Sequence, residues 1–181
     1  MRSKLSLPLV IAFYTGLAAI SFLIGWYALE RNIFLWYRPE YASLPLSVAL
    51  GAAGGGLVVL LSRLLERWAA WARELSRLLG QMLGQLDHNA IIVLSVFSAL
   101  GEEALFRGLL QPELGIVWSS LIFGLLHIGP DRRYLSWTMM AIGMGFGFGG
   151  LFVLSGNLLA PILAHFTINY FNLHALNKRA E

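Results

Sequence analysis

Long apolar runs dominate the chain, and their lengths can be compared with the thickness of a membrane. About 20 consecutive apolar residues are needed for a helix to cross a bilayer. Runs that fit this requirement, or come close to it, lie at 7–29, 44–61, 89–110, 116–128, 135–154 and 158–176. The run at 116–128 is short, and Gly129-Pro130-Asp131 breaks the helix after it. The pattern therefore predicts an all-α bundle of about six membrane-spanning helices.

Segment 63–87 has an amphipathic pattern of residues instead of a continuous apolar run. Its apolar residues recur in steps of three or four, at Leu64, Trp68, Trp71, Leu75, Leu78, Met82 and Leu86. Between them lie Arg67, Arg73, Glu74 and Arg77. This spacing predicts an amphipathic helix whose tryptophans and cations suit the surface of an anionic membrane. The alternative is a helical extension that packs on the rest of the protein.

Composition narrows the class of protein. Hydrophobic residues make up 57% of the 181 residues and charged residues only 13%, against about 25% charged in soluble domains. This composition disfavours both a disordered chain and an ordinary soluble domain. Cysteine is absent, so disulfides, cysteine–zinc sites and cysteine nucleophiles are excluded.

The basic residues indicate how the helices cross the membrane. With the N-terminus in the cytoplasm, ten of the thirteen Lys and Arg residues fall on the cytoplasmic side. Only Arg31 and Arg38 fall outside, and Arg107 lies within a span. The sequence therefore predicts six spans with both termini in the cytoplasm. The net charge of +3 follows from topology and does not indicate nucleic acid as a partner.

Three charged residues interrupt the third apolar run. A charge inside a bilayer costs about 3 kcal/mol or more, so such residues are functional candidates. Glu103 and Arg107 are four residues apart and can pair on one helix face. Glu102 points about 100° away and needs a partner from another helix. An inert buried network is the alternative interpretation of these charges.

The fourth and sixth apolar runs carry histidines with a matching polar or aromatic neighbour. Phe123 and His127 are four residues apart, as are His165 and Asn169. Together with Glu102, these side chains can hold a water molecule, with or without a divalent metal. His88 and His174 lie near the ends of spans and are expected to be interfacial.

These residues resemble the motifs of a known family. Glu-Glu-x-x-x-Arg at 102–107, Phe-x-x-x-His at 123–127 and His-x-x-x-Asn at 165–169 resemble the CPBP family of intramembrane proteases. This group includes CAAX proteases and bacteriocin-processing (Abi) proteins. Asn157 and Pro161, ahead of the last histidine, strengthen the resemblance, which covers about 93–172. On this basis 1–88 is expected to be a two-span region with the amphipathic helix on the cytoplasmic face. Residues 89–181 would be the catalytic helical core of a single membrane domain.

The resemblance implies an endopeptidase that acts on a membrane-anchored or exported protein or peptide. Glu102 would activate water with His127 as its partner, and His165 and Asn169 would stabilise the oxyanion. Glu103 and Arg107 would form an orienting pair. A metal-dependent version would use Glu102, His127 and His165 as ligands for Zn²⁺, with Glu103 in the role of base. The metal-free version is favoured, because no His-Glu-x-x-His pairing supplies two ligands from one helix.

Other interpretations remain open at this point. The same motifs would be present in a non-catalytic membrane immunity or scaffold protein, and intramembrane Glu and His also build proton-coupled transporters. The excess of Arg over Lys, eleven to two, together with the small size, favours a bacterial protein in the cytoplasmic (inner) membrane.

Gly145-x-Gly147-x-x-Gly150 matches a dinucleotide fingerprint as a string, but no strand precedes it. Its glycines, with Gly143 and Gly149, predict close helix contacts instead of nucleotide binding.

One feature of the predicted spans is inconsistent with a shared site. Glu102 lies about 20 Å from the cytoplasmic end of its span at 1.5 Å per residue. His127 falls near the cytoplasmic end of the short fourth run. Either the helices are staggered or the fourth helix starts deeper in the bilayer than its apolar run suggests.

Overall fold

The computed structural model describes residues 6–34 and 43–179. Its helices, in chain order, are α1 (Leu7–Tyr27), α2 (Leu44–Trp68), α3 (Ala70–Leu83), α4 (His88–Glu103), the π-helix η2 (Ala104–Leu110), α5 (Gln111–Leu125), the 3₁₀ helix η3 (Arg132–Tyr134), α6 (Leu135–Ser155) and α7 (Leu159–Arg179). No β-strand occurs among the described residues, which confirms the all-α class. Of the basic residues used to predict topology, Arg2, Lys4 and Arg38 lie outside the described residues, as do the side chains of Lys178 and Arg179.

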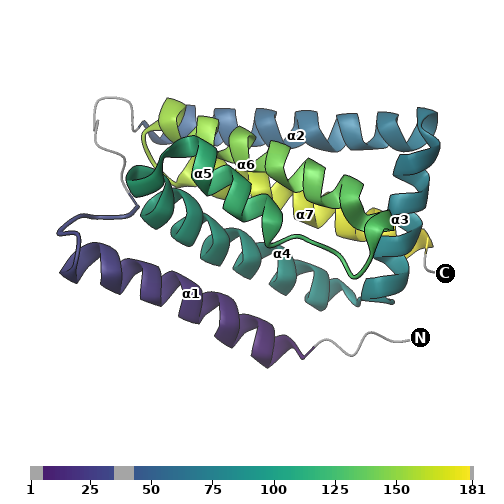
Figure 1. Cartoon of the computed structure of the whole chain (residues 1–181), viewed down its shortest axis with the longest axis horizontal. Coiled ribbons are helices and arrows are strands. Elements are labelled where there is room, and N and C mark those ends of the chain that lie inside the picture. The colour runs from purple at the N-terminus through teal and green to yellow at the C-terminus, as the bar shows by residue number, and fades with distance from the viewer. Residues whose placement is uncertain (1–5, 35–42, 180–181) are drawn as a thin grey trace.

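Most helices run along one axis, and α3 crosses one end of the bundle (Figure 1). Four helical stretches of the described residues are long and apolar enough to cross a membrane: Leu7–Tyr27, Leu44–Trp68, His88–Leu125 and Arg132–Ser155. Two features explain the difference from the six spans predicted from sequence. The third and fourth predicted spans lie in the single stretch His88–Leu125. The sixth predicted span, α7, is not among the four.

Gly115 divides the long stretch into two antiparallel arms. Its backbone has φ +79° and ψ 166°, outside the helical region, and glycine adopts a positive φ without steric cost. The chain reverses here, so α5 returns alongside η2, which continues α4 (Figure 1). The prediction of two separate passes at 89–110 and 116–128 therefore agrees with the path of the chain, although the helical assignment is continuous.

The interior position of α7 explains its polar composition. It packs against α2, α3, α4 and α6, and Phe171 is the only exposed residue in 159–177.

Helices α2 and α7 contact each other through small residues. A Cβ on Gly51 would lie 2.7 Å from the carbonyl oxygen of Ala160, and one on Gly55 would lie 3.0 Å from that of Ala164. Small residues at such spacing let membrane helices approach closely.

The glycines of α6 follow the prediction only in part. A Cβ on Gly145 would lie 2.8 Å from Cα of Ser120, and one on Gly149 would lie 2.7 Å from Oε1 of Gln111. These two glycines therefore allow the close contact that was predicted. A Cβ on Gly143, Gly147 or Gly150 would meet no atom of a neighbouring helix within 4 Å, so the prediction is wrong for these three.

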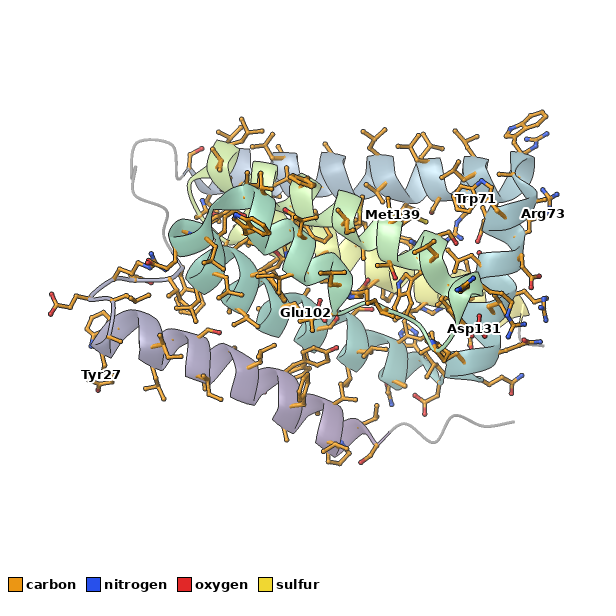
Figure 2. The ribbon with its side chains drawn as sticks, viewed as in Figure 1. Tyr27, Trp71, Arg73, Glu102, Asp131 and Met139 are labelled. Atoms are coloured by element: carbon orange, nitrogen blue, oxygen red, sulfur yellow. The ribbon has the colours of Figure 1, made fainter. Side chains whose placement is uncertain are left out.

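Helix α3 packs on the bundle through its apolar face. Leu75 and Leu78 are buried against Tyr134, with Leu79 and Trp137 beside them. The alternative in which this segment packs on the protein is therefore correct for that face. Trp68 and Trp71 remain exposed, at 76% and 47%, and Figure 2 shows Trp71 and Arg73 at this end of the molecule.

Candidate active site

The α4–α5 hairpin brings Glu102 and His127 to one level. Glu102 lies 13 residues before Gly115, and His127 lies 12 residues after it. Since the chain reverses at Gly115, both lie about 20 Å from the turn. Helix α5 ends at Leu125, well before the end of the bundle that carries α3 (Figure 1). The fourth helix therefore lies deeper than its apolar run suggested, which resolves the inconsistency in depth.

Side chains from three parts of the chain meet at Glu102. Its Oε2 lies 3.9 Å from Nε2 of His127 and 3.9 Å from Nε2 of His165. The same Oε2 is buried and has no hydrogen-bond partner among the described residues. Figure 2 shows Glu102 beside the end of α5. The partner that Glu102 needed from another helix is thus a pair of histidines.

The orientation of His127 follows from the end of α5. Its backbone N–H donates to Gly124 O at 2.9 Å, so the carbonyl of Phe123 lacks its usual helical donor. The Nδ1–H of His127 donates to that carbonyl at 2.7 Å, because a carbonyl oxygen can only accept. In the neutral ring Nε2 then carries a lone pair directed toward Glu102.

Glu103 orients the second histidine. Its Oε1 accepts from Nη1 of Arg107 at 3.1 Å, which confirms that the two side chains pair. The same oxygen accepts from Nδ1–H of His165 at 2.7 Å, a contact that sequence spacing did not reveal. Nε2 of the neutral His165 ring therefore also presents its lone pair to Glu102. Glu103 and Arg107 are completely buried, with 0% and 1% of their side chains exposed.

Aromatic rings enclose the buried cation. The Arg107 guanidinium lies 4.5 Å from the centroid of Phe123, 5.2 Å from Phe148 and 5.7 Å from Phe106. The His165 ring stacks on Phe148 at 4.8 Å. Nη2 of Arg107 also donates to Gly145 O at 3.0 Å. These contacts compensate for part of the cost of burying the guanidinium.

Arg107 lies in a π-helix that the sequence did not reveal. Helix η2 starts directly after Glu103, and π-helical turns inside α-helices occur frequently at functional sites. Arg31 holds the end of η2 by donating from Nη2 to the carbonyls of Gly108 at 3.3 Å and Leu109 at 2.8 Å. Arg31 also pairs with Glu113 at 2.7 Å.

The remaining candidates have different surroundings. Asn169 donates from Nδ2 to Ser98 Oγ at 3.0 Å, which ties α7 to α4 one turn beyond His165. Asn157 caps the start of α7, because its Oδ1 accepts from the backbone N–H of Leu159 at 2.9 Å. His88 and His174 lie together in a separate ring cluster, with centroids 5.4 Å apart.

The side chains of Glu102, His127 and His165 are of the types that bind zinc, but their donor atoms lie too far apart to share one metal ion. Two imidazole nitrogens and a carboxylate oxygen are typical Zn²⁺ ligands at about 2.0–2.1 Å, which places tetrahedral ligands about 3.3 Å apart. Oε2 of Glu102 lies 3.9 Å from each Nε2. Among residues 6–34 and 43–179, no group of three His, Cys, Asp or Glu side chains has the geometry to hold a metal ion. As arranged, the three atoms fit a hydrogen-bonded water better than a metal.

Comparison with known proteins relates the segment that carries this site to a protease family. Residues 85–171 match the family model described as type II CAAX prenyl endopeptidase Rce1-like. The chain is also 43% identical over 82 residues to the uncharacterized protein YpbD of Bacillus subtilis (strain 168). That alignment covers 44% of this chain and 41% of the relative, so it spans about two fifths of the relative's length. No solved structure matches the chain. The matched segment contains all three motifs, and the match confirms that this part of the chain resembles the CPBP group of proteases.

Proposed function

We propose that this protein is an intramembrane endopeptidase in which Glu102 activates a water molecule for attack on a peptide bond. One observation carries the proposal. The buried Oε2 of Glu102, which has no hydrogen-bond partner among the described residues, faces two histidine Nε2 atoms at 3.9 Å each. Three hydrogen-bond acceptors at this spacing suit a water molecule that donates to two of them.

In the proposed reaction, the water donates one hydrogen to Glu102 Oε2 and the other to His127 Nε2. Its lone pair then points away from both and attacks the substrate carbonyl carbon. Glu102 takes one proton as the new C–O bond forms, and passes it to the amide nitrogen as the C–N bond breaks. The products are a carboxylic acid and an amine, so atoms and protons balance.

The negative charge on the carbonyl oxygen needs hydrogen-bond donors. Asn169 donates to Ser98 Oγ through Nδ2, and an amide NH₂ has a second hydrogen for an oxyanion. His165 would serve as a second donor after its Nε2 takes up a proton from solution before the reaction and returns it afterwards, with the Glu103 carboxylate at Nδ1 to balance the charge. A preorganised donor in a dry site contributes about 3 kcal/mol to the transition state.

The proposed location is a bacterial cytoplasmic membrane, with the α3 end of the bundle in the cytoplasm. This end holds most basic side chains of the described residues, on α2, α3 and η3, whereas Arg31 follows α1 at the opposite end (Figure 1). Helix α5 ends at the level of Glu102, so the site opens toward the same end. His127 supports this direction, since its side chain is 24% exposed. The substrate we propose is a membrane-anchored or exported protein or peptide.

The test uses purified protein in liposomes and a quenched fluorescent peptide ending in a prenylated CAAX sequence, chosen because the family is described as Rce1-like. Wild-type protein is compared with Glu102→Gln and with Glu74→Gln, a matched control on an exposed carboxylate. In parallel, mass spectrometry compares new peptide termini in membranes from cells that express each form. We expect cleavage with the wild type and the control, and none with Glu102→Gln.

The outcomes separate the parts of the proposal. New termini that depend on Glu102, without cleavage of the prenylated peptide, would support the protease and redirect the substrate class. Equal cleavage by wild type and a folded Glu102→Gln variant would overturn the role of Glu102. Absence of any Glu102-dependent cut in both assays would overturn the protease and leave a non-catalytic role or transport.

A further inference from the structure

His127 lies in a part of the chain that has left the helix. Helix α5 ends at Leu125, and the side chains on either side of His127, those of Leu126 and Ile128, are 69% and 64% exposed. Chain between helices is generally more mobile than the helices that it joins. In the proposed reaction, however, His127 must hold a water molecule at a fixed place beside Glu102. Contacts from outside this segment therefore have to fix its position.

Two neighbouring residues of α6 make such contacts. The hydroxyl of Thr138 donates to the backbone carbonyl of His127 at 3.0 Å, and Thr138 is buried. The Trp137 ring meets the His127 ring edge to face, with centroids 5.6 Å and planes 89° apart, an arrangement that aromatic rings favour. The hydrogen bond holds the backbone of His127, and the indole ring limits the movement of its side chain. Both residues lie outside the three motifs of the site.

The surroundings of Trp137 fix it in turn. Its ring centroid lies 6.4 Å from that of Tyr134. Tyr134 is buried against Leu75 and Leu78 of α3, in a cluster on which Trp137 also packs, and its hydroxyl donates to the carbonyl of Leu78 at 3.4 Å. A Cβ on Gly129 would collide with the Tyr134 side chain, so glycine lets the chain after α5 fold closely over this cluster. The segment between α5 and α6 is thus held against both α6 and α3.

We propose that Thr138 and Trp137 are positioning residues that hold Nε2 of His127 in its place 3.9 Å from Oε2 of Glu102. This inference rests on the proposed function, because it assigns a task within the same reaction. Neither residue takes or gives a proton, and both act through His127. Their contribution matters because a misplacement of about 1 Å can lower a rate about 100-fold. Helix α6 thereby contributes to catalysis from outside the motifs.

The first test compares kcat and KM of variants at residue 138 in the liposome assay, with a peptide that the wild type cleaves. Thr138→Val keeps the shape of the side chain and removes the donor, whereas Thr138→Ser keeps the hydroxyl. Thr167→Val is the control, because that hydroxyl donates within α7, to Leu163 O at 2.7 Å. We expect Thr138→Val to lower kcat about 10- to 100-fold with KM unchanged. Thr138→Ser and Thr167→Val should keep a kcat close to that of wild type.

The ring contact is tested with Trp137→Leu in the same assay. Trp118→Leu is its control, because this indole on α5 is 63% exposed. We expect Trp137→Leu to lower kcat about 10-fold or more with KM unchanged, and Trp118→Leu to keep the wild-type kcat.

A second measurement separates a freed His127 from a loosened fold. Diethyl pyrocarbonate labels histidine rings, and mass spectrometry reports the labelling rate of each one in detergent micelles. The His127 side chain is 24% exposed and that of His165 only 7%, whereas His88 is exposed. We expect Thr138→Val and Trp137→Leu to speed labelling of His127 about 2- to 10-fold, the range that the loss of one average hydrogen bond gives. Labelling of His165 and His88 should not change.

Each result decides one point. A Thr138→Val variant with the kcat and His127 labelling of wild type, beside an inactive Glu102→Gln, would overturn the role of Thr138 and leave the proposed function standing. A lowered kcat that Thr138→Ser shares, or faster labelling of His165 as well as His127, would also overturn it, because either pattern indicates loss of packing. A Trp137→Leu variant that behaves as wild type would overturn the role of Trp137. Wild-type protein that cleaves no substrate would instead defeat the proposed function, while the labelling of His127 still tests the two contacts.

Discussion

Nδ1 of His165 lies 2.7 Å from Oε1 of Glu103, on an oxygen that also accepts from Arg107 at 3.1 Å. One carboxylate oxygen therefore connects the histidine of the site to a cation that is completely buried. This arrangement fixes the ring of His165 and leaves Nε2 free to face Glu102. In the proposed reaction the Glu-Glu pair thus has two tasks, since Glu102 would activate water and Glu103 orients His165.

The Glu103–Arg107 pair should be strongly coupled. Removing either partner leaves a buried charge uncompensated, so Glu103→Gln and Arg107→Met should each destabilise the fold by about 3–5 kcal/mol. The double variant should lose at least about 1 kcal/mol less than the sum, because contacting residues are not additive. Denaturant unfolding in detergent micelles measures all three. The control is the exposed pair of Glu74 and Arg77 on α3, for which we expect no measurable coupling; equal coupling in both pairs would contradict the prediction.

Arg31 should stabilise the π-helix locally. Its Nη2 donates to the carbonyls of Gly108 and Leu109, and a hydrogen bond from a charged group contributes about 1.5–3 kcal/mol. Arg31→Ala should therefore lower the free energy of unfolding by about 2–3 kcal/mol and speed hydrogen–deuterium exchange in η2 more than in α6. Glu113→Gln removes only the half-exposed ion pair and should cost about 0–1 kcal/mol. Unchanged exchange in η2 would contradict this role.

Local spacing predicted part of the site and no more. Glu103 and Arg107 pair as expected, because four residues on one helix place two side chains on the same face. Hydropathy located the helical passes of the chain, since side chains that face lipid must be apolar over the length of a span. Helix α7 shows where that signal weakens, because an interior helix contacts protein and can carry polar side chains.

The contacts that depend on the third dimension were not predictable. Oε1 of Glu103 serves both Arg107 and His165, and only the packing of α7 on α4 brings these groups together. Tyr14 lies on α1 and carries no motif, so nothing in its local sequence connects it to Gly101, against which its backbone packs. The reversal at Gly115 had one local signal, a glycine between two apolar runs, and its positive φ set the depth of His127. The π-helix had none, because the residues 104–110 are compatible with an ordinary helix.

The contact between α2 and α7 should depend on glycine at particular positions. A Cβ on Gly51 would lie 2.7 Å from a backbone oxygen of α7 and 2.9 Å from Cβ of Leu163. Gly51→Ala should therefore cost about 1–3 kcal/mol, as overpacking does. Gly56 lies on the same helix with nothing within 4 Å, so Gly56→Ala should be neutral or stabilise by up to about 1 kcal/mol through helix propensity. Thermal unfolding in detergent compares the two, and equal destabilisation would argue against the close contact.

Removing divalent metal should leave the proposed peptidase active. Oε2 of Glu102 lies 3.9 Å from both Nε2 atoms, whereas ligands on one tetrahedral Zn²⁺ lie about 3.3 Å apart. The ring hydrogens of His127 and His165 are fixed by the carbonyl of Phe123 and the carboxylate of Glu103, so both lone pairs point at Glu102 and suit a donating water. We expect incubation with EDTA or 1,10-phenanthroline to leave the rate of peptide cleavage unchanged, and metal analysis of the purified protein to find zinc well below one per chain. A known zinc protease treated in parallel shows that the chelators work. Loss of cleavage that added Zn²⁺ restores would contradict the water mechanism, and would mean that Glu102, His127 and His165 move closer together around a metal.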